Sequence, residues 1–464
     1  MKDNLEFLLP RILFLLWLWL FAIVVFTGWP RLWGMIPLGP TEGDWALPVA
    51  LICTVMIFGP GAGLFAWVNK WLTYSKKNIN RRSVRLIGLV FLYLTIFFIA
   101  WILRSENHFM GDGWLYISEV EKPFYLSITR PLDFFIHQLF HRIVQVLGLG
   151  GGEAAYALLH CFLCPVFLWT CWNIAGLITS DFLGRAVLGL LMASTTVLQL
   201  FVGYVECYTL LNLWVVIYIY TGIKYLCNRQ NVKNPWVPTI IFVLVFFSHR
   251  SGVVLGPSLL FLWLYRLLPG RSTNNKLFNP FFLVALIFPL PLVFGLITKS
   301  PSVSLLVPLW GPNANSQAPY SLFSIEHLWE KLNFLMLICP AAVVALPVIT
   351  SKWRLLKRWD NSSFIFVFWC CAGSVFFSFI LNPLLGIRDW DLLSISGVPL
   401  ALFSGWCLLT VLKKGRSRDA FLRALAVAAT VHGMAWVWVN ADIDRGVAFL
   451  DHIDMRTITR APGN

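Results

Sequence analysis

Four short polar motifs interrupt a strongly apolar sequence, and their side chains are of types that do chemistry. They are Gly111-Asp112-Gly113 with Trp114 and Tyr116, Gly203-Tyr204-Val205-Glu206, Ser248-His249-Arg250-Ser251, and Asn382-Pro383 through Gly386 to Arg388-Asp389-Trp390-Asp391. A carboxylate can act as a general base, and a guanidinium binds phosphate through paired hydrogen bonds. The motifs together indicate acid–base chemistry beside an anionic group.

Asp112 is the strongest candidate for a general base. The flanking glycines, Gly111 and Gly113, let the backbone take positive φ and bring the carboxylate close to a ligand. The alternative is an ordinary surface turn, because Asp-Gly is common in turns. The position of Asp112 in a long loop, just before Trp114 and Tyr116, favours a catalytic role.

Glu206 and the His249-Arg250 pair are candidates for a second acid or base and for phosphate binding. Glu206 lies between apolar runs, where burial tends to raise the pKa of a carboxyl group. It is expected to act as an acid or base, or to bind a ligand hydroxyl. Arg250 would hold a phosphate, with His249 as a second donor. The alternative for all three is a buried structural ion pair between Glu206 and Arg250.

The last motif supplies further binding candidates. Arg388 is the best candidate phosphate ligand, and Asp389 and Asp391 would hold it or contact a ligand hydroxyl. Trp390 offers a stacking surface, although a Trp flanked by charges is also typical of any membrane interface. Two further candidates for substrate binding are Tyr204 and Arg130.

The composition identifies the elements that must position these residues. Of 464 residues, 58% are hydrophobic and 12% are charged, about half the charged fraction of soluble domains. Such a chain is expected to lie in a bilayer. The net charge of +14 comes from short clusters between apolar runs, which argues against a nucleic-acid-binding face. The ten cysteines lie mostly in apolar runs, so neither disulfides nor a metal site is expected.

The apolar runs predict an all-α bundle of about thirteen membrane-spanning helices in a single domain, 1–464. The expected spans are 8–28, 46–68, 86–104, 153–178, 184–203, 207–223, 237–250, 252–268, 278–298, 333–350, 361–381, 392–412 and 421–439. Basic clusters within 70–85, 224–233, 266–276, 352–358 and 413–423 are assigned to the cytoplasm by the positive-inside rule. The N-terminus is then cytoplasmic, and all four polar motifs lie at external helix ends.

Long external segments complete the predicted topology. They are the loop 105–152, a second loop at 299–332, and the tail 440–464. In the first loop, Leu132, Phe135, Leu139 and Ile143 fall on one side of a helix and polar residues on the other, which predicts an interfacial amphipathic helix. The chain contains no Gly-rich P-loop, G-x-S-x-G or H-E-x-x-H motif, which argues against nucleotide hydrolysis, α/β-hydrolase chemistry and zinc catalysis.

This layout resembles the GT-C class of integral-membrane glycosyltransferases, which use polyprenyl-phosphate-linked sugars. The resemblance lies in the many-helix bundle and in the first long external loop, with its acidic residue in the stretch from Ala100 to Gly113. It implies that Asp112 deprotonates an acceptor hydroxyl, and that Arg250 or Arg388 binds the lipid phosphate. The expected reaction is an inverting hexosyl or pentosyl transfer to a lipid, glycan or protein acceptor.

Other features of the sequence bear on the expected cofactor and on the cellular location. The Gly111-Asp112-Gly113 motif carries a single Asp rather than paired acids, so we expect transfer without a metal, with a divalent cation as the alternative. The compact loops favour a prokaryotic plasma membrane.

The competing hypothesis is a transporter or flippase for a lipid-linked or anionic substrate, and a third hypothesis is a non-catalytic membrane scaffold. A transporter would be expected to distribute charged residues toward both faces and to show similar halves.

Overall fold

The computed structural model describes Gly34 and residues 82–108, 110–123, 127–228, 234–267, 306–307, 320–352, 361–382 and 386–457. The expected spans 8–28, 46–68 and 278–298 lie outside these residues, as does most of the loop 299–332. The count of thirteen spans and the assignment of the segments to membrane faces therefore stay predictions.

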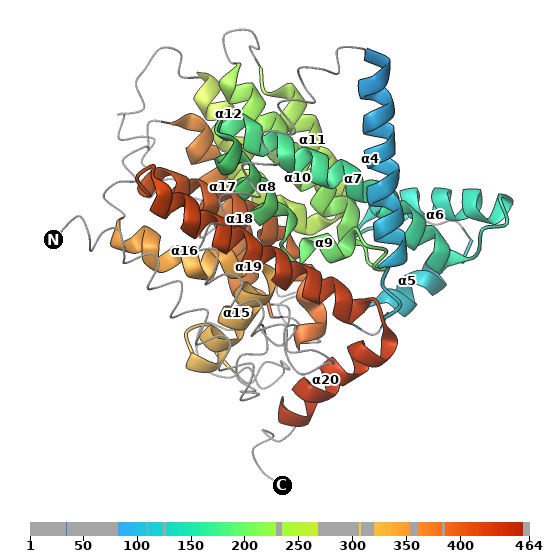
Figure 1. Ribbon diagram of the computed structural model, residues 1–464. Coiled ribbons are helices and arrows are strands. Elements are labelled where there is room, and N and C mark those ends of the chain that lie inside the picture. The colour runs from blue at the N-terminus through green and yellow to red at the C-terminus, as the bar shows by residue number, and fades with distance from the viewer. Residues whose placement is uncertain are drawn as a thin grey trace.

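The described residues are almost entirely helical (Figure 1). The elements are α4 (Arg82–Ile102), α5 (Gly113–Val120), α6 (Pro131–Val146), α7 (Gly152–Ile178), α8 (Phe182–Ala193), α9 (Val197–Leu200), α10 (Tyr208–Cys227), α11 (Trp236–Ser248), η2 (Arg250–Leu255), α12 (Gly256–Leu267), α15 (Ile325–Ile338), α16 (Pro340–Ser351), α17 (Ser362–Ile380), η6 (Gly386–Ser396), α18 (Gly397–Val411), α19 (Arg416–Asn440) and α20 (Ile443–Thr457). Within the described ranges, β-type pairing is limited to one antiparallel bridge between Leu306 and Leu381.

Five helices in the described ranges are long and apolar enough to cross a bilayer, and a bent pair makes a sixth. The five are α7, α10, α17, the segment Asp389–Val411 and α19. The chain is therefore an integral membrane protein with a helical fold, as its composition predicts.

Two expected spans are divided in the structure. The run 333–350 becomes the end of α15 and then α16, which meet at an angle of 110°. Pro340 begins α16, and a proline lacks the N–H needed to continue the preceding helix. The run 184–203 is divided at Ser194–Thr196, where the Thr196 N–H donates to Ile338 O at 3.2 Å instead of continuing α8.

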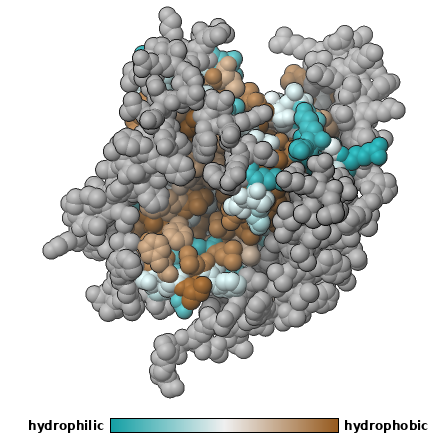
Figure 2. Space-filling view, turned by 90° about the vertical axis from the view of Figure 1, so that its left-hand side faces the viewer, coloured by the Kyte–Doolittle hydropathy of each residue, from teal (hydrophilic) through white to brown (hydrophobic). Residues whose placement is uncertain are grey.

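The centre of the bundle is formed by helices that are apolar around most of their circumference. α10 packs against α7, α11 and α17, and α18 packs against α8, α16 and α17. α4 lies at one side of the bundle in Figure 1 and contacts α7. Its large side chains, including Leu86, Phe91 and Ile102, are exposed, as expected for a surface that contacts lipid. Apolar side chains also form much of the described surface that is visible in Figure 2.

α6 is the amphipathic helix predicted in the first long loop. Phe135, Leu139 and Ile143 are exposed along one side, whereas Asp133 and His137 are fully buried on the other. The polar face therefore points into the protein and the apolar face points outward, which suits a helix in contact with lipid. This orientation places ionisable groups of α6 against α7.

Candidate functional site

Three chain segments that are far apart in the sequence converge on Gly111. The first is the loop between α4 and α5, the second is the turn between α9 and α10, and the third is η6. A Cβ atom added to Gly111 would stand 2.6 Å from Glu206 Oε1, 3.0 Å from Asp391 Oδ2 and 3.1 Å from the Tyr204 hydroxyl. Gly111 has φ of +133°, so both the crowding and the backbone conformation require glycine.

Glu206 is buried beneath this loop and accepts two backbone hydrogen bonds. The Asp112 N–H donates to Glu206 Oε1 at 2.6 Å, and the Cys207 N–H donates to Oε2 at 3.2 Å. Burial raises the pKa of Glu206 to about 8, and the nearby charge of Asp112 adds to the rise, whereas the two backbone hydrogen bonds and Arg130 oppose it. Glu206 therefore joins the turn before α10 to the loop before α5.

Asp112 is exposed, although its main chain is bonded to the buried Glu206. The residue is the N-cap of α5, but its side chain makes no capping hydrogen bond. Its side chain is exposed, while the neighbouring Gly113 is buried. The carboxylate is thus held near the buried acids by its own main-chain amide and remains accessible to a ligand.

Asp391, Trp390 and Tyr204 form the other side of the cluster. Asp391 is 3% exposed, and its Oδ1 accepts the Leu392 N–H at 2.7 Å, while Oδ2 has no hydrogen-bond partner. The ring of Trp390 lies 5.4 Å from that of Tyr204 and 5.5 Å from that of Trp436. Because Trp390 is fully buried, it packs inside the protein and does not offer the free stacking surface that the sequence suggested.

His249 lies between α11 and η2, beside the start of α10, and Arg250 is the first residue of η2. The ring of His249 packs edge-on against Tyr208 at 5.1 Å, and Tyr208 follows Glu206 by two residues. The Ser251 N–H donates to His249 Nδ1 at 3.2 Å, so the neutral ring carries its proton on Nε2. Burial and the charges of Arg250 and Arg130 lower the pKa of His249 to about 4.

Arg250 is exposed and does not form the ion pair with Glu206 that was the structural alternative. No salt bridge between these two side chains occurs, although both are described. The Arg250 main-chain N–H instead donates to Thr129 O at 3.2 Å, next to Arg130. The side chain of Arg250 is exposed, and the residue directly follows His249, whose ring packs against Tyr208.

Arg130 is a buried cation with partners inside the protein. Its guanidinium pairs with Glu119 and lies 3.8 Å from the centre of the Tyr116 ring. One of its nitrogen atoms, Nη1, is buried without a partner. The expected role of Arg130 in substrate binding stays a prediction. The same holds for Asp389, which is half-buried, and for Arg388, whose side chain lies outside the described residues.

The carboxylate oxygens of the buried acids near Gly111 differ in their hydrogen-bond partners. Both oxygens of Glu206 accept backbone N–H groups, which leaves Asp391 Oδ2 as the one buried oxygen without a partner among the described acids near Gly111. No group of three or more His, Cys, Asp or Glu side chains in the described ranges is placed to bind a metal.

One part of the site was missed from the sequence. His160 lies in the middle of α7 and is fully buried against His137 of α6 and the Tyr204 carbonyl. The signal that could have found it is a histidine inside an otherwise apolar span, because such a group requires polar partners.

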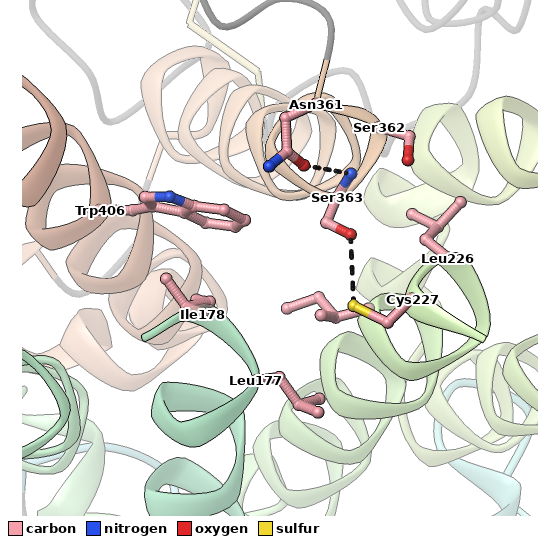
Figure 3. Close-up of a pocket in the computed structure, with 9 residues that line it drawn as sticks. Leu177, Ile178, Leu226, Cys227, Asn361, Ser362, Ser363 and Trp406 are labelled. Carbon is pink, nitrogen blue, oxygen red and sulfur yellow. Dashed lines mark hydrogen bonds between the residues drawn. The ribbon is translucent and has the colours of Figure 1, made fainter. Parts of the chain in front are cut away.

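A separate cavity of about 590 Å³ lies at the C-terminal ends of α7 and α10 (Figure 3), whereas Glu206 precedes the N-terminal end of α10. It is lined by residues from the ends of α7 and α10, the start of α17, and α18, which are Leu177, Ile178, Ile223, Leu226, Cys227, Asn361, Ser362, Ser363 and Trp406. None of the acids near Gly111 lines it.

Comparisons with known proteins found one notable likeness. No protein-family model matches the chain, and no curated protein sequence matches it. Among solved structures, the chain is similar to that of ArnT from Cupriavidus metallidurans, which was solved bound to undecaprenyl phosphate. The two share 11% sequence identity with a TM-score of 0.46, over 78% of this chain and 77% of that chain.

Proposed function

We propose that the protein is a membrane glycosyltransferase that moves a sugar from a polyprenyl-phosphate donor to an acceptor hydroxyl on the external face of the membrane. The observation that carries the proposal is the exposed carboxylate of Asp112, held by its main-chain N–H on the buried Glu206. An accessible carboxylate on a rigid acidic cluster suits a general base, because its position is fixed while its oxygen atoms stay available to a substrate.

The chemistry assigned to the site is a single displacement. Asp112 removes the proton of the acceptor hydroxyl, and the acceptor oxygen attacks the anomeric carbon as the bond to the lipid phosphate breaks. The exposed guanidinium of Arg250 neutralises the charge that develops on the leaving phosphate, with Arg388 as a second proposed ligand. One displacement inverts the anomeric centre. The phosphate is a good leaving group, so the reaction needs no strong general acid.

Glu206 and Asp391 support the base rather than react. Glu206 has both oxygens engaged by backbone N–H groups, so it fixes the loop of Asp112. Asp391 Oδ2 is the free buried acceptor beside Gly111, and it is suited to accept a hydrogen bond from a sugar hydroxyl that enters the cluster. The exposed side of α6 is apolar, and α6 contacts α5, which begins directly after Asp112, so this helix suits a donor that arrives from the bilayer.

The test is transfer of radiolabelled sugar from a panel of polyprenyl-phosphate donors in membranes that carry the wild type or Asp112→Asn. Asp112→Asn is expected to lower kcat by about 10²- to 10⁴-fold. The matched control is Glu106→Gln, which removes an exposed carboxylate from the same loop. Size exclusion in detergent checks the fold of each variant. If no donor supports transfer while the protein binds or moves a lipid-linked substrate, the transporter hypothesis replaces the proposal.

A further inference from the structure

A row of buried polar groups runs from α6 through α7 to the back of the site. His137 Nδ1 lies 2.9 Å from Asp133 O and 3.3 Å from Asp133 Oδ1. His137 Nε2 lies 2.9 Å from Nε2 of His160, whose Nδ1 lies 2.7 Å from Tyr204 O. All three ionisable side chains in this row are fully buried. The row ends on the turn that carries Glu206.

The Nδ1 atoms of His137 and His160 must both carry protons. With Asp133 ionised, both groups that face His137 Nδ1 are oxygen acceptors, so Nδ1 donates. The Tyr204 carbonyl likewise only accepts, so His160 Nδ1 donates to it. The nearby Thr209 hydroxyl, 3.2 Å from His160 Nδ1, donates to Leu200 O at 2.9 Å and therefore does not reverse this assignment.

If both rings are neutral and protonated on Nδ1, the Nε2 atoms of His137 and His160 face each other with two lone pairs. With both Nδ1 atoms protonated, both Nε2 atoms of neutral rings are acceptors, and acceptors do not approach to 2.9 Å. A neutral pair could place its hydrogen bond between the rings only by leaving one Nδ1 lone pair against a carbonyl oxygen. One additional proton between the two Nε2 atoms satisfies every contact at once.

The surrounding charges favour the additional proton. Asp133 is fully buried, and the ion pair that it makes within the described ranges is with His137. Arg130, the nearest basic side chain by sequence, pairs with Glu119. A buried carboxylate requires nearby positive charge. Arg130 acts on Asp133 electrostatically without a direct ion pair, and a cationic imidazole pair adds a positive charge in direct contact with Asp133. The ionisable groups around the pair on α5, α6, α7 and the turn before α10 are Tyr116, Arg130, Asp133, His141, Tyr156, Tyr204, Glu206 and Cys207. The neighbouring helix α11 carries none.

We propose that His137 and His160 share one proton, and that this cationic pair, balanced by Asp133, positions the Tyr204–Glu206 turn. The pair joins the lipid-facing helix α6 to the carbonyl of Tyr204, whose hydroxyl stands beside Gly111. His137 and His160 are therefore positioning residues, since neither touches the Asp112 carboxylate. The positioning of catalytic groups rests on the proposed function, whereas the shared proton and the anchoring of the turn do not.

The shared proton is tested by NMR of the full-length protein in nanodiscs with ¹⁵N-labelled histidine at neutral pH. The expected result is one far-downfield imidazole proton that couples to two ring nitrogens and disappears in His137→Gln and in His160→Gln. Two separately neutral imidazole rings in the wild type would overturn the proposal. This measurement on the wild type decides the matter even if the variants fail to fold.

The anchoring of the turn is tested by hydrogen exchange followed by mass spectrometry. Amides of residues 203–207 are expected to exchange about ten-fold faster in either variant than in the wild type. The matched control is His432→Gln, which removes another buried histidine that bonds a carbonyl, Leu337 O at 3.0 Å, and has no imidazole partner. Unchanged exchange in His160→Gln, or equal acceleration in His432→Gln, would overturn positioning.

Activity provides the third measurement and separates the two proposals. If the wild type transfers sugar, His160→Gln is expected to lower kcat about ten-fold with the KM for the donor unchanged, and His432→Gln is expected to have no such effect. Unaltered kcat in His160→Gln would contradict the catalytic consequence of the pair. If the wild type transfers no sugar, the proposed function fails, while the NMR and exchange experiments still decide the shared proton and the anchoring.

Discussion

The main-chain N–H of Asp112 donates a hydrogen bond of 2.6 Å to Oε1 of Glu206, 94 residues further along the chain. This bond joins the loop before α5 to the turn before α10. It leaves the carboxylate of Asp112 exposed while that of Glu206 is buried. Two carboxyl groups in adjacent positions therefore have different environments, and the predictions below follow from that difference.

Glu206 is expected to make the protein less stable as pH rises. Its pKa is raised from 4.5 to about 8 in the folded protein, so between these values the folded state holds a proton that the unfolded state has released. The free energy of unfolding should therefore fall as pH rises from about 4.5 to 8. Melting temperatures measured in detergent across this range should show the decline in the wild type and a flatter profile in Glu206→Gln. Identical slopes in the two proteins would contradict the assignment.

His249 is expected to make the protein less stable as the pH falls below about 6.5. Its pKa is lowered from 6.5 to about 4, so the unfolded state takes up a proton first as the pH falls. The stabilisation from His249 is complete above about pH 6.5 and is lost toward pH 4. In His249→Asn, the side-chain oxygen can still accept the Ser251 N–H but does not titrate. A thermal melt series should show a shallower loss of stability in this variant, and an unchanged slope would count against the prediction.

Gly111→Ala is expected to damage the site and lower stability. The new methyl group would overlap Glu206 Oε1 at 2.6 Å, and a φ of +133° strains any residue other than glycine. We expect a cost of about 1–3 kcal/mol in the free energy of unfolding, together with loss of transfer. Gly148→Ala is the control, since Gly148 also has positive φ, at +65°, but has no neighbouring atom within 4 Å of an added Cβ. Chemical denaturation of both variants measures the difference, and equal effects would show that the contacts of Gly111 do not matter.

Arg250→Ala is expected to weaken binding of the donor phosphate. The side chain of Arg250 is exposed and does not pair with Glu206, so it is available to an anion. Loss of a charge-assisted hydrogen bond should raise the KM for a polyprenyl-phosphate donor by about 10- to 100-fold. Arg266→Ala removes a positive charge at the far end of α12 and should leave the KM unchanged. A donor KM that is the same in Arg250→Ala and in the wild type would exclude Arg250 as a phosphate ligand.

The sequence by itself determined the class of fold and the residues worth examining. Long apolar runs must become helices in a bilayer, because backbone N–H and C=O groups find no water there. The period of 3.6 residues was enough to predict α6 from Phe135, Leu139 and Ile143. Ionisable residues between apolar runs are costly unless they have partners, which drew attention to Glu206, whereas the flanking glycines drew attention to Asp112.

Only the tertiary structure decided which of these residues meet and what each one contacts. The approach of Glu206 to Gly111 depends on how α5, α10 and η6 pack, and sequence spacing carries no information about contacts between distant segments. The same packing left Arg250 exposed instead of paired with Glu206, and it buried Trp390. The bend between α15 and α16 and the contact of His137 with His160 likewise depend on neighbouring helices. Local sequence determines where helices form, whereas the packing of distant segments determines which buried polar groups contact one another.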